Sequence, residues 1–567
     1  MNTAFHDAMA AAYALTQPGL TLGAPMVDGE VEADVRVQVA LAMISRHGLI
    51  AGATGTGKTT TLKVLAGELS AVGVPVFISD IKGDVTGIAA PNDPNNPAVV
   101  QRAKDLQLAF QPAGHPVEFL SLSGQLGAQV RASVHSFGPV LLGKVLELND
   151  TQTSILSLIF KYCDDNQLPL LDLKDLQAIL KYLSSDEGKP ALADYGGMSP
   201  ASVGVLLRSI IMLEQSGADI FFGEPEFDVS DLLRTSPDGK GIVSVLELSD
   251  VMDKPKLFST FMLWMLAQLY HLLPEVGDLP QPKLAFFFDE AHLLFEDASQ
   301  ALLDQIEQTV RLIRSKGVGV FFSTQAPTDI PPAILAQLGN RIEHALRAFT
   351  PQDADNLHKT ARTFPMSAFY DVEKVITQLG IGEALVTVLS PKGVPTALAA
   401  TRLVPPDSLF GALEPAAFQV LVANGPLRYK YGTTIDRQSA YEIITARIQS
   451  AQAAAQAAAQ AAAQTAAPPG YPAAPAGYPA GAPATPGQVT MTQAEYQRQL
   501  REQEREAAQA QRAADQAQRA QQRAQAQAAA AQKREETQIL RTGTRLVTSG
   551  VGQSLIRGVF GTLFGKH

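Results

Sequence analysis

Two hydrophobic periodicities alternate along roughly the first 410 residues, and together they predict an α/β fold. Short continuous apolar runs are typical of buried parallel strands. Such runs occur at 74–80, 117–122, 242–248, 283–288 and 317–325, with two further strands expected at 382–389 and 396–404. Apolar residues at every third or fourth position, the spacing of amphipathic helices, mark 146–162, 173–183 and 199–216. These helices predict an all-helical insertion within the α/β domain.

A glycine-rich turn follows the apolar residues 49–51 and opens a helix. The turn matches the phosphate-binding pattern G-x-x-x-x-G-K-[ST]. Glycines let backbone N–H groups approach phosphate oxygens, and the helix start adds partial positive charge. We expect Lys58 to reach the β- and γ-phosphates and the Thr59 hydroxyl to ligate Mg²⁺. A chance match is the alternative, but the flanking strand and helix argue against it. The predicted nucleotide-binding residues are Gly52, Ala53, Thr54, Gly55, Thr56, Gly57, Lys58, Thr59 and Thr60.

Acidic residues end two of the predicted strands. Asp289 and Glu290 follow the run at 283–288, where Asp289 is expected to hold Mg²⁺ and Glu290 to act as the general base toward water. Surface acids capping an ordinary strand are the alternative, which the phosphate-binding loop weakens. Asp80 and Lys82, at the end of the run at 74–80, lie either at the ligand crevice of the sheet or in a solvated turn.

Three further side chains are candidates for contact with the γ-phosphate. Gln325 ends the strand at 317–325, where its amide can hydrogen-bond the phosphate or the water. Arg341, at the start of an expected strand at 338–346, can reach the nucleotide of a neighbouring subunit and stabilise transition-state charge. Arg347 is the second arginine candidate. Ordinary strand-end polarity for Gln325 and surface ion pairs for the arginines are the alternatives.

Composition and charge narrow the class of protein. The single cysteine, Cys163, excludes an internal disulfide framework and a cysteine zinc site, and indicates a reducing, cytoplasmic compartment. No uncharged apolar run is long enough to span a membrane, and the N-terminus lacks the basic start of a signal peptide. Residues 451–567 carry 12 basic and 7 acidic side chains against a net charge of −11 for the chain, so residues 1–450 are strongly acidic. Contact with DNA would therefore need a local basic surface.

From about Ile44 to Pro406 the chain resembles the HerA–FtsK superfamily of ring-forming ATPases, and within it the helicase-HerA-like C-terminal-domain proteins of the YjgR type. The stretches that carry the resemblance are HGLIAGATGTGKTTTL, FISDIKGD, KLAFFFDEAHLLF, RLIRSKGVGVFFSTQ and DIPPAILAQLGNRIEHALRAFTPQD. The resemblance implies a RecA-like P-loop sheet, ATP and Mg²⁺ as cofactors, and a homo-oligomer in the form of a hexameric ring. It also implies that Gln325 is the sensor glutamine and Arg341 the arginine finger acting in trans. HerA-type translocases carry an N-terminal β-barrel, for which we expect no room before Gly48.

The same patterns set the expected domain boundaries. A short N-terminal segment covers 1–47, and the ATPase core covers 48–125 and 236–410 around a helical insertion at 126–235. A helical edge follows at 411–450. Residues 451–538 form an Ala/Gln/Pro-rich tail, helix-prone or disordered, and 539–567 form a basic amphipathic segment. This last segment suits a partner groove, an anionic membrane surface or docking on its own ring.

Two functions from different classes remain open at this point. The set of nucleotide-site residues favours an ATP-hydrolysing motor that moves DNA through a ring, as a helicase or translocase does. The acidic body and the long tail favour a nucleotide-switched assembly or scaffold ATPase that does not act on DNA and recruits a protein partner or a membrane through its tail.

Overall fold

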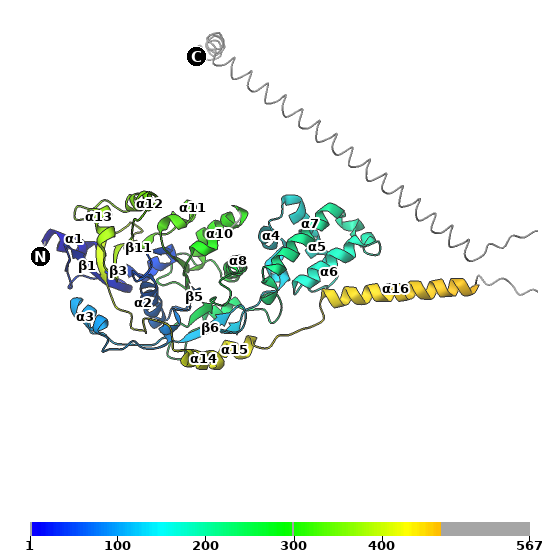
Figure 1. Cartoon of the computed structure of the whole chain (residues 1–567), viewed down its shortest axis with the longest axis horizontal. Helices are drawn as coiled ribbons and strands as arrows, with labels where there is room; N and C mark the ends of the chain where they lie inside the picture. The colour runs from blue at the N-terminus through cyan, green and yellow to red at the C-terminus, as the bar shows by residue number, and fades with distance from the viewer. Residues whose placement is uncertain (1–2, 297–299, 466–567) are drawn as a thin grey trace, which may run out of the picture. The chain divides into compact units, whose positions relative to one another are not determined.

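A thirteen-stranded sheet organises the part of the chain that the computed structural model describes, residues 3–296 and 300–465 (Figure 1). The strands are β1 (Gly19–Val27), β2 (Glu30–Val31), β3 (Val37–Ala40), β4 (Gly48–Ala51), β5 (Val76–Asp80), β6 (Val117–Ser121), β7 (Ala128–Gln129), β8 (Val243–Glu247), β9 (Leu284–Phe288), β10 (Val318–Thr324), β11 (Asn340–His344), β12 (Glu383–Thr387) and β13 (Ala399–Leu403). The α/β prediction is confirmed, and each predicted apolar run contains a strand.

The sheet has a parallel centre and an antiparallel edge. Its spatial order is β2, β1, β13, β12, β11, β4, β10, β9, β5, β8, β6, β7, with β3 paired to β1. All pairs from β11 to β7 are parallel, whereas β12, β13 and the N-terminal strands pair antiparallel. β10 therefore lies between β4, which leads into the glycine-rich loop, and β9, which leads into Asp289. This is a RecA-like P-loop arrangement.

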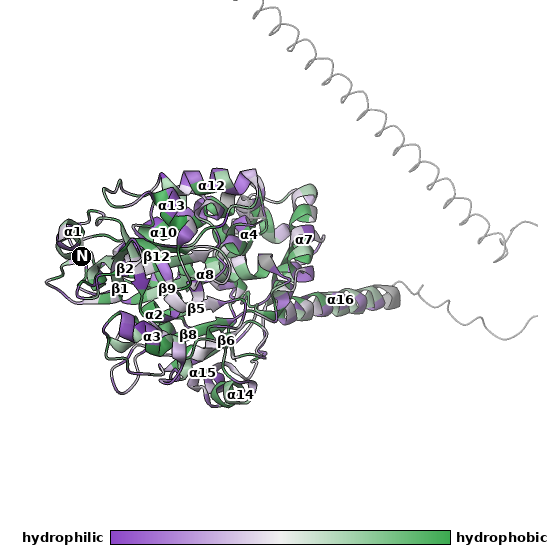
Figure 2. Cartoon of the chain, turned by 60° about the vertical axis from the view of Figure 1, so that its left-hand side comes forward, coloured by the Kyte–Doolittle hydropathy of each residue, from purple (hydrophilic) through white to green (hydrophobic). Residues whose placement is uncertain are grey.

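Helices cover both faces of this sheet, as Figures 1 and 2 show from two directions. The helices of the core are α1 (Thr3–Tyr13), α2 (Lys58–Ala71), α3 (Pro97–Asp105), α8 (Pro255–Leu272), α9 (His292–Phe295), α10 (Gln300–Ile313), α11 (Pro332–Leu335), α12 (Pro351–Ala361) and α13 (Val372–Gln378). Alternate strand residues face opposite sides: Phe287 packs in the core with α1 and α2, and Phe288 in the core with α8, α10 and α11. The central strands are buried on both faces, which explains their continuous apolar runs.

Four helices lie between β7 and β8 along the chain: α4 (Val134–Val145), α5 (Asp150–Asp165), α6 (Leu173–Ser184) and α7 (Pro200–Gln215). The predicted helix start at Leu146 is wrong, because Leu146 is the C-cap residue of α4. α5 begins after Asn149, whose side chain accepts from the Gln152 N–H in a capping box. α4 itself escaped prediction because Gly138, at φ 67°, and Pro139 interrupt its helical pattern.

Three helices follow the sheet: α14 (Pro415–Asn424), α15 (Pro426–Tyr431) and α16 (Ala440–Thr465). The first turns of α16 pack on α6, where Asp175 accepts a bond from the Tyr441 N–H at 2.8 Å, and residues 449–461 are all exposed. The chain divides into two units, 1–467 and 468–567. The predicted tail beyond residue 465 and its amphipathic end lie outside the described residues. Within the described part, none of the helices combines the length and apolar character that crossing a membrane requires.

Candidate nucleotide site

The predicted site residues converge because parallel strands end at one edge of the sheet. Ala51, the last residue of β4, is in register with Thr324, the last residue of β10. Phe288, the last residue of β9, is in register with Phe322 of β10 and with Ser79 of β5. The residues that follow these strand ends, namely the glycine-rich loop, Gln325, Asp289 with Glu290, and the turn after Asp80, therefore share this edge.

The loop between β4 and α2 needs its glycines for two different reasons. Gly52, Gly55 and Gly57 have φ angles of 144°, 78° and 112°, which side chains of L-residues disfavour. At Gly52 there is also no space, since an added Cβ would lie 2.5 Å from the Cβ of His344, whereas at Gly55 it would meet nothing within 4 Å. Lys58 is the first residue of α2, so the loop leads directly into a helix N-terminus, as predicted.

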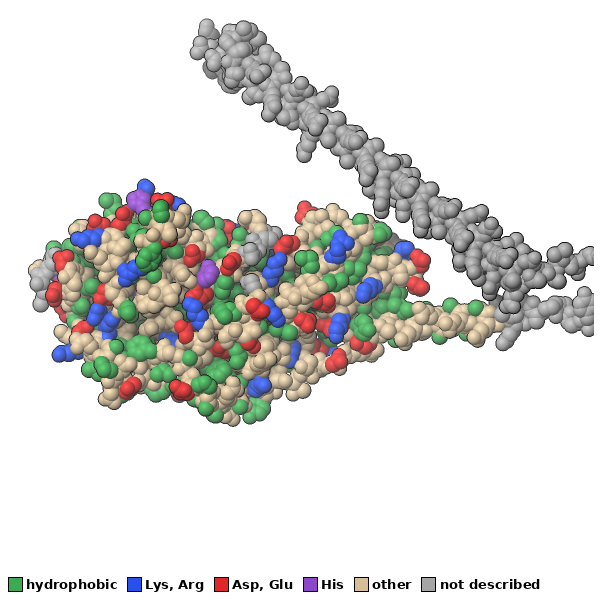
Figure 3. Space-filling model, in the orientation of Figure 1, with side chains coloured by type: hydrophobic (Ala, Val, Ile, Leu, Met, Phe, Trp, Pro, Cys, Tyr) green, Lys and Arg blue, Asp and Glu red, His purple; other side chains and the backbone are tan. Residues whose placement is uncertain are grey.

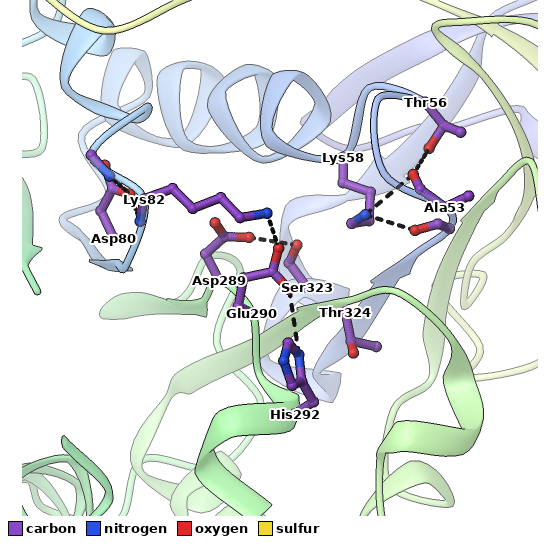
Figure 4. A network of polar contacts seen from close by, with 12 residues as sticks. Ala53, Thr56, Lys58, Asp80, Lys82, Asp289, Glu290, His292, Ser323 and Thr324 are labelled. Atoms are coloured by element: carbon purple, nitrogen blue, oxygen red, sulfur yellow. Dashed lines mark hydrogen bonds and ion pairs between the residues drawn. The ribbon is translucent and has the colours of Figure 1, made fainter. Parts of the chain in front are cut away.

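Lys58 folds back into this loop (Figure 4). Its ammonium donates to the carbonyl oxygens of Gly52 at 2.6 Å and Ala53 at 3.3 Å. The side chain is buried, and burial lowers its pKa. Thr56 closes the loop by donating from Oγ1 to the Ala53 carbonyl at 2.7 Å. These bonds close the glycine-rich loop around the ammonium group of Lys58, so the loop is preformed for binding phosphate.

Asp289 presents an oxygen without a partner to a cluster of carboxylates. Its Oδ1 accepts from Ser323 Oγ at 2.9 Å, while Oδ2 is buried and makes no hydrogen bond. Burial raises the pKa of Asp289 to about 7, against the lowering effect of the Ser323 bond. One oxygen each of Asp80, Asp84 and Asp289 lies within 4.8 Å of the others. Carboxylate oxygens are the donors that Mg²⁺ prefers, so this donor set fits the predicted cation. Thr59, the other predicted ligand, is the second residue of α2 and half-buried.

Glu290 is held between two basic side chains. It is only 4% exposed and adopts a left-handed backbone conformation, with φ at 46°. Lys82 Nζ contacts its Oε1, and His292 Nδ1 lies 3.3 Å from its Oε2 (Figure 4). Burial lowers the pKa of Lys82, but the hydrogen bond and charge of Glu290 outweigh it, so the pKa is raised. Oε2 makes no hydrogen bond, so the contact with Lys82 is the one that fixes the orientation of this carboxylate.

Gln325 borders a cavity of about 710 Å³ beside the loop. Ala53 and Thr54 also line it, as do His292 and Arg347. The position of Gln325 is set by Asp329, whose Oδ2 accepts from Thr324 Oγ1 at 2.8 Å and from the Ala326 N–H at 2.9 Å. Gln325 itself is exposed, with its side chain at the edge where hydrolysis chemistry was predicted.

The two arginine candidates differ in their surroundings. Arg341 lies within β11, opposite Leu49 of β4, and is half-buried. Burial lowers its pKa, which the charge of Glu343, two residues on, opposes. Arg347 is exposed and lines the cavity beside the loop. The structure therefore brings Arg347 to the glycine-rich loop of its own chain and leaves Arg341 inside the sheet.

Sequence reasoning missed several residues of this site. Ser323 and His292 contact the two acids, yet in sequence they are an ordinary strand serine and the fourth residue of Asp-Glu-Ala-His. His344 Nε2 forms a hydrogen bond with Thr61 Oγ1 at 3.0 Å. The same histidine occupies the space into which a side chain at Gly52 would extend. A signal existed for Ser323 only, since it lies two residues before Gln325 in the apolar run at 317–325 that was predicted to be a strand.

Comparison with solved structures gave distant matches. The bacterial conjugative coupling protein TrwBdeltaN70, in an unbound form, is 16% identical, with a TM-score of 0.46 over 72% of this chain and 93% of that chain. TrwB in complex with a GTP analogue is 15% identical, with a TM-score of 0.45 over 71% and 98%. VirB4 of Thermoanaerobacter pseudethanolicus is 15% identical, with a TM-score of 0.42 over 69% and 98%. No curated protein matches the chain.

Comparison with protein families gave a match over most of the sequence. The family described as helicase HerA-like C-terminal matches residues 26–478. The match includes every residue of the candidate site, from the glycine-rich loop to Arg347. The chain therefore belongs to the helicase HerA-like C-terminal family of P-loop ATPases.

Proposed function

We propose that this protein hydrolyses ATP with Mg²⁺ and works as a ring of identical subunits, as HerA-type DNA translocases do. The observation that carries the proposal is the buried pair Asp289 and Glu290, which shares the edge of the sheet with a preformed phosphate loop. Asp289 has a free buried oxygen for a cation, and Glu290 is oriented by Lys82, with His292 Nδ1 3.3 Å from its Oε2. Burying an acid without a full set of hydrogen-bond or charge partners costs free energy, and proteins concentrate such groups at functional sites, so the location of this pair favours chemistry there.

Each residue has a distinct task in the proposed reaction. Lys58 exchanges its bonds to the Gly52 and Ala53 carbonyls for phosphate oxygens. Thr59 and Asp289 hold Mg²⁺, which when bound neutralises phosphate charge. Glu290 takes a proton from the attacking water, and Gln325 orients that water or contacts the γ-phosphate. Residues 53–60 enclose the phosphates with backbone N–H groups.

Two substitutions test the site. Glu290→Gln keeps the shape of the side chain and removes its basicity, so turnover is expected to fall about 10²- to 10⁴-fold while nucleotide affinity persists. Lys58→Ala is expected to weaken binding itself. The measurements are steady-state phosphate release and titration with a fluorescent nucleotide. Glu275→Gln, at an exposed position away from the site, is the matched control. Normal turnover by Glu290→Gln would remove Glu290 as the base.

The ring and the trans arginine are tested together. In the proposal Arg341 reaches the nucleotide of the neighbouring subunit once the ring has assembled, and Arg347 is the competing residue. A mixture of Arg341→Ala and Lys58→Ala chains is expected to recover part of the activity that each lacks alone, because some interfaces then combine two intact halves. Native mass measured with Glu290→Gln and Mg-ATP reports the ring size. If mixing with Lys58→Ala chains restores activity to Arg347→Ala and not to Arg341→Ala, the arginine finger is Arg347.

A second function, a nucleotide-switched scaffold that does not act on DNA, is favoured by charge. Residues 1–450 are strongly acidic, and the face in Figure 3 shows acidic and basic side chains interspersed over the helical and sheet parts. Non-specific DNA binding requires clustered basic groups. Phosphate release is therefore to be measured with duplex, single-stranded and forked DNA. Stimulation supports the translocase, and an unchanged rate with all three supports the scaffold, recruited through its C-terminal tail to a protein partner or membrane.

A further inference from the structure

The nucleotide site has a second side, beyond the phosphate loop, that the proposed reaction does not use. The acids and Gln325 follow β9 and β10, which lie on one side of β4 in the sheet. On the other side of β4 lie β11, β12 and β13. A triphosphate whose γ end faces Glu290 must direct its nucleoside away from β9. The nucleoside therefore leaves the loop toward the ends of β12 and β13.

A small cavity occupies that position. It has a volume of about 130 Å³ and begins at Gly57 and Thr60, the end of the loop and the first turn of α2. Its remaining lining is mainly apolar and includes Ile381, Leu403 and Phe410. We propose that this cavity binds the base of the nucleotide, with Ile381 and Phe410 as the side chains that contact it. The proposal rests on the proposed nucleotide function and specifies where the base lies.

Hydrogen bonds from Arg102 of α3 fix the backbone of several residues that line the cavity. Its guanidinium donates to the carbonyl oxygens of Ile381 at 2.9 Å, Gly382 at 2.5 Å and Leu403 at 3.1 Å. Arg102 thereby joins the loop before β12 to the end of β13, two segments that are otherwise linked at this edge by the bond from the Leu403 N–H to the Gly382 carbonyl. Arg102 is itself one of the residues that line the cavity.

Lys63 of α2 fixes the backbone of Phe410, another lining residue. This lysine is fully buried, and its ammonium donates to the carbonyls of Leu409, Phe410 and Gly411 at 3.1, 3.0 and 2.9 Å. The same helix thus carries Lys58 for the phosphates and, five residues on, the group that fixes the backbone of Phe410. This geometry keeps the distance from the phosphate loop to the apolar wall constant, which suits a ligand with a phosphate end and a flat apolar end.

The exposure of Ile381 leaves apolar surface in the cavity that a ligand can cover. Ile381 is 75% exposed although it lines an apolar wall. A nucleobase covers such a side chain and stacks on an aromatic ring such as that of Phe410. The larger cavity beside Gln325 also has an exposed aromatic residue, Phe349 at 88%, but its lining includes the polar groups Asp329, Asp353 and Asn356 and lies on the hydrolysis side of the loop. Phe349 is therefore the competing site to be tested.

The experiment compares two ligands that differ in the nucleoside. The full chain is titrated with Mg-ATP and with Mg-tripolyphosphate, which fills the phosphate loop alone. Phe410→Ala is expected to weaken ATP binding roughly 5- to 100-fold and to leave tripolyphosphate binding within about twofold. Ile381→Ala, at an exposed position that does not endanger folding, is expected to act in the same direction by a few-fold. Ile435→Ala, an exposed isoleucine away from this cavity, is the matched control and should change neither affinity.

The outcomes separate this proposal from the proposed function. If Phe410→Ala and Ile381→Ala leave the ratio of the two affinities at its starting value, the base lies elsewhere and the inference is overturned. If Phe349→Ala instead weakens the binding of ATP and leaves the binding of tripolyphosphate unchanged, the base lies in the larger cavity. If Lys58→Ala leaves tripolyphosphate binding intact, the phosphate loop itself is refuted, and with it the proposed function.

Discussion

Replacement of Gly52 by alanine is the sharpest test of how the phosphate loop is built. The new Cβ would lie 2.5 Å from the Cβ of His344 and 3.1 Å from its Cα, and both belong to β11, which cannot move without breaking its pairing to β4. The φ of 144° adds strain of its own. Gly55→Ala shares the positive φ, at 78°, but meets no atom within 4 Å, and so serves as the matched control.

Both variants place a side chain at a positive φ, and the main difference between them is the steric conflict with His344. A side chain held in a disfavoured backbone region costs about 1–3 kcal/mol, which both variants incur. Forcing a methyl group into a packed site adds about 1–3 kcal/mol, which only Gly52→Ala incurs. Gly52→Ala is therefore expected to destabilise the chain by about 2–6 kcal/mol and Gly55→Ala by about 1–3 kcal/mol. The loop is also expected to shift away from His344, so that Gly52→Ala loses nucleotide affinity.

Denaturant unfolding gives the free energies, and titration with a fluorescent nucleotide gives the affinities. The unfolding slope should match the parent in both variants, since neither changes the surface that unfolding exposes. Equal destabilisation by the two substitutions would show that β11 does not limit the loop. In that case the contact between Gly52 and His344 would not be what demands glycine at this position.

Three further predictions concern buried polar groups. Lys63→Met removes the ammonium and leaves three carbonyls without a donor, so a loss of about 2–4 kcal/mol is expected in denaturant unfolding, and a loss below about 0.5 kcal/mol would contradict this role. Burial raises the pKa of Glu68 to about 8, so the folded state holds an extra proton between about pH 4.5 and 8 and stability falls as pH rises through that window. Glu68→Gln is therefore expected to gain roughly 4–5 kcal/mol over the parent above pH 8 and nothing near pH 4, measured by unfolding across that range. Ser323→Ala removes the hydrogen bond to Asp289 Oδ1. The Mg²⁺ concentration for half-maximal turnover is expected to rise about tenfold, because the ligand loses the group that orients it. An unchanged Mg²⁺ dependence of turnover would contradict this role of Ser323.

The sequence was sufficient for features that depend on neighbours in the chain. The phosphate loop has its glycines and lysine at fixed spacing, and β9 and β10 are buried on both faces, which leaves continuous apolar runs. The grouping of Asp289 and Gln325 also followed from sequence, because parallel strands share one carboxyl edge. Only the order of strands was needed from the structure to place them side by side.

Features that depend on distant partners were not predictable. Lys63 looks like a solvated residue on an amphipathic helix, yet its partners lie 346 to 348 residues further along the chain. The contact of Lys82 with Glu290 spans 208 residues. Arg341 has the same appearance in sequence as Arg347, and its burial is decided by β4 and β12, the strands that flank β11. Side-chain burial of this kind depends on topology, which local periodicity does not contain.

The pairing of β1 with β13 has a consequence for synthesis on the ribosome. Gly23 is in register with Leu403, so the edge of the sheet is completed only after some 380 further residues have been made. At about 5–20 residues per second this takes roughly 20–80 s. Until then β1 has only its local partners β2 and β3, and an unpaired strand edge is open to association with other chains. The segment from β1 to β3 therefore keeps an open strand edge through most of the synthesis of the described chain.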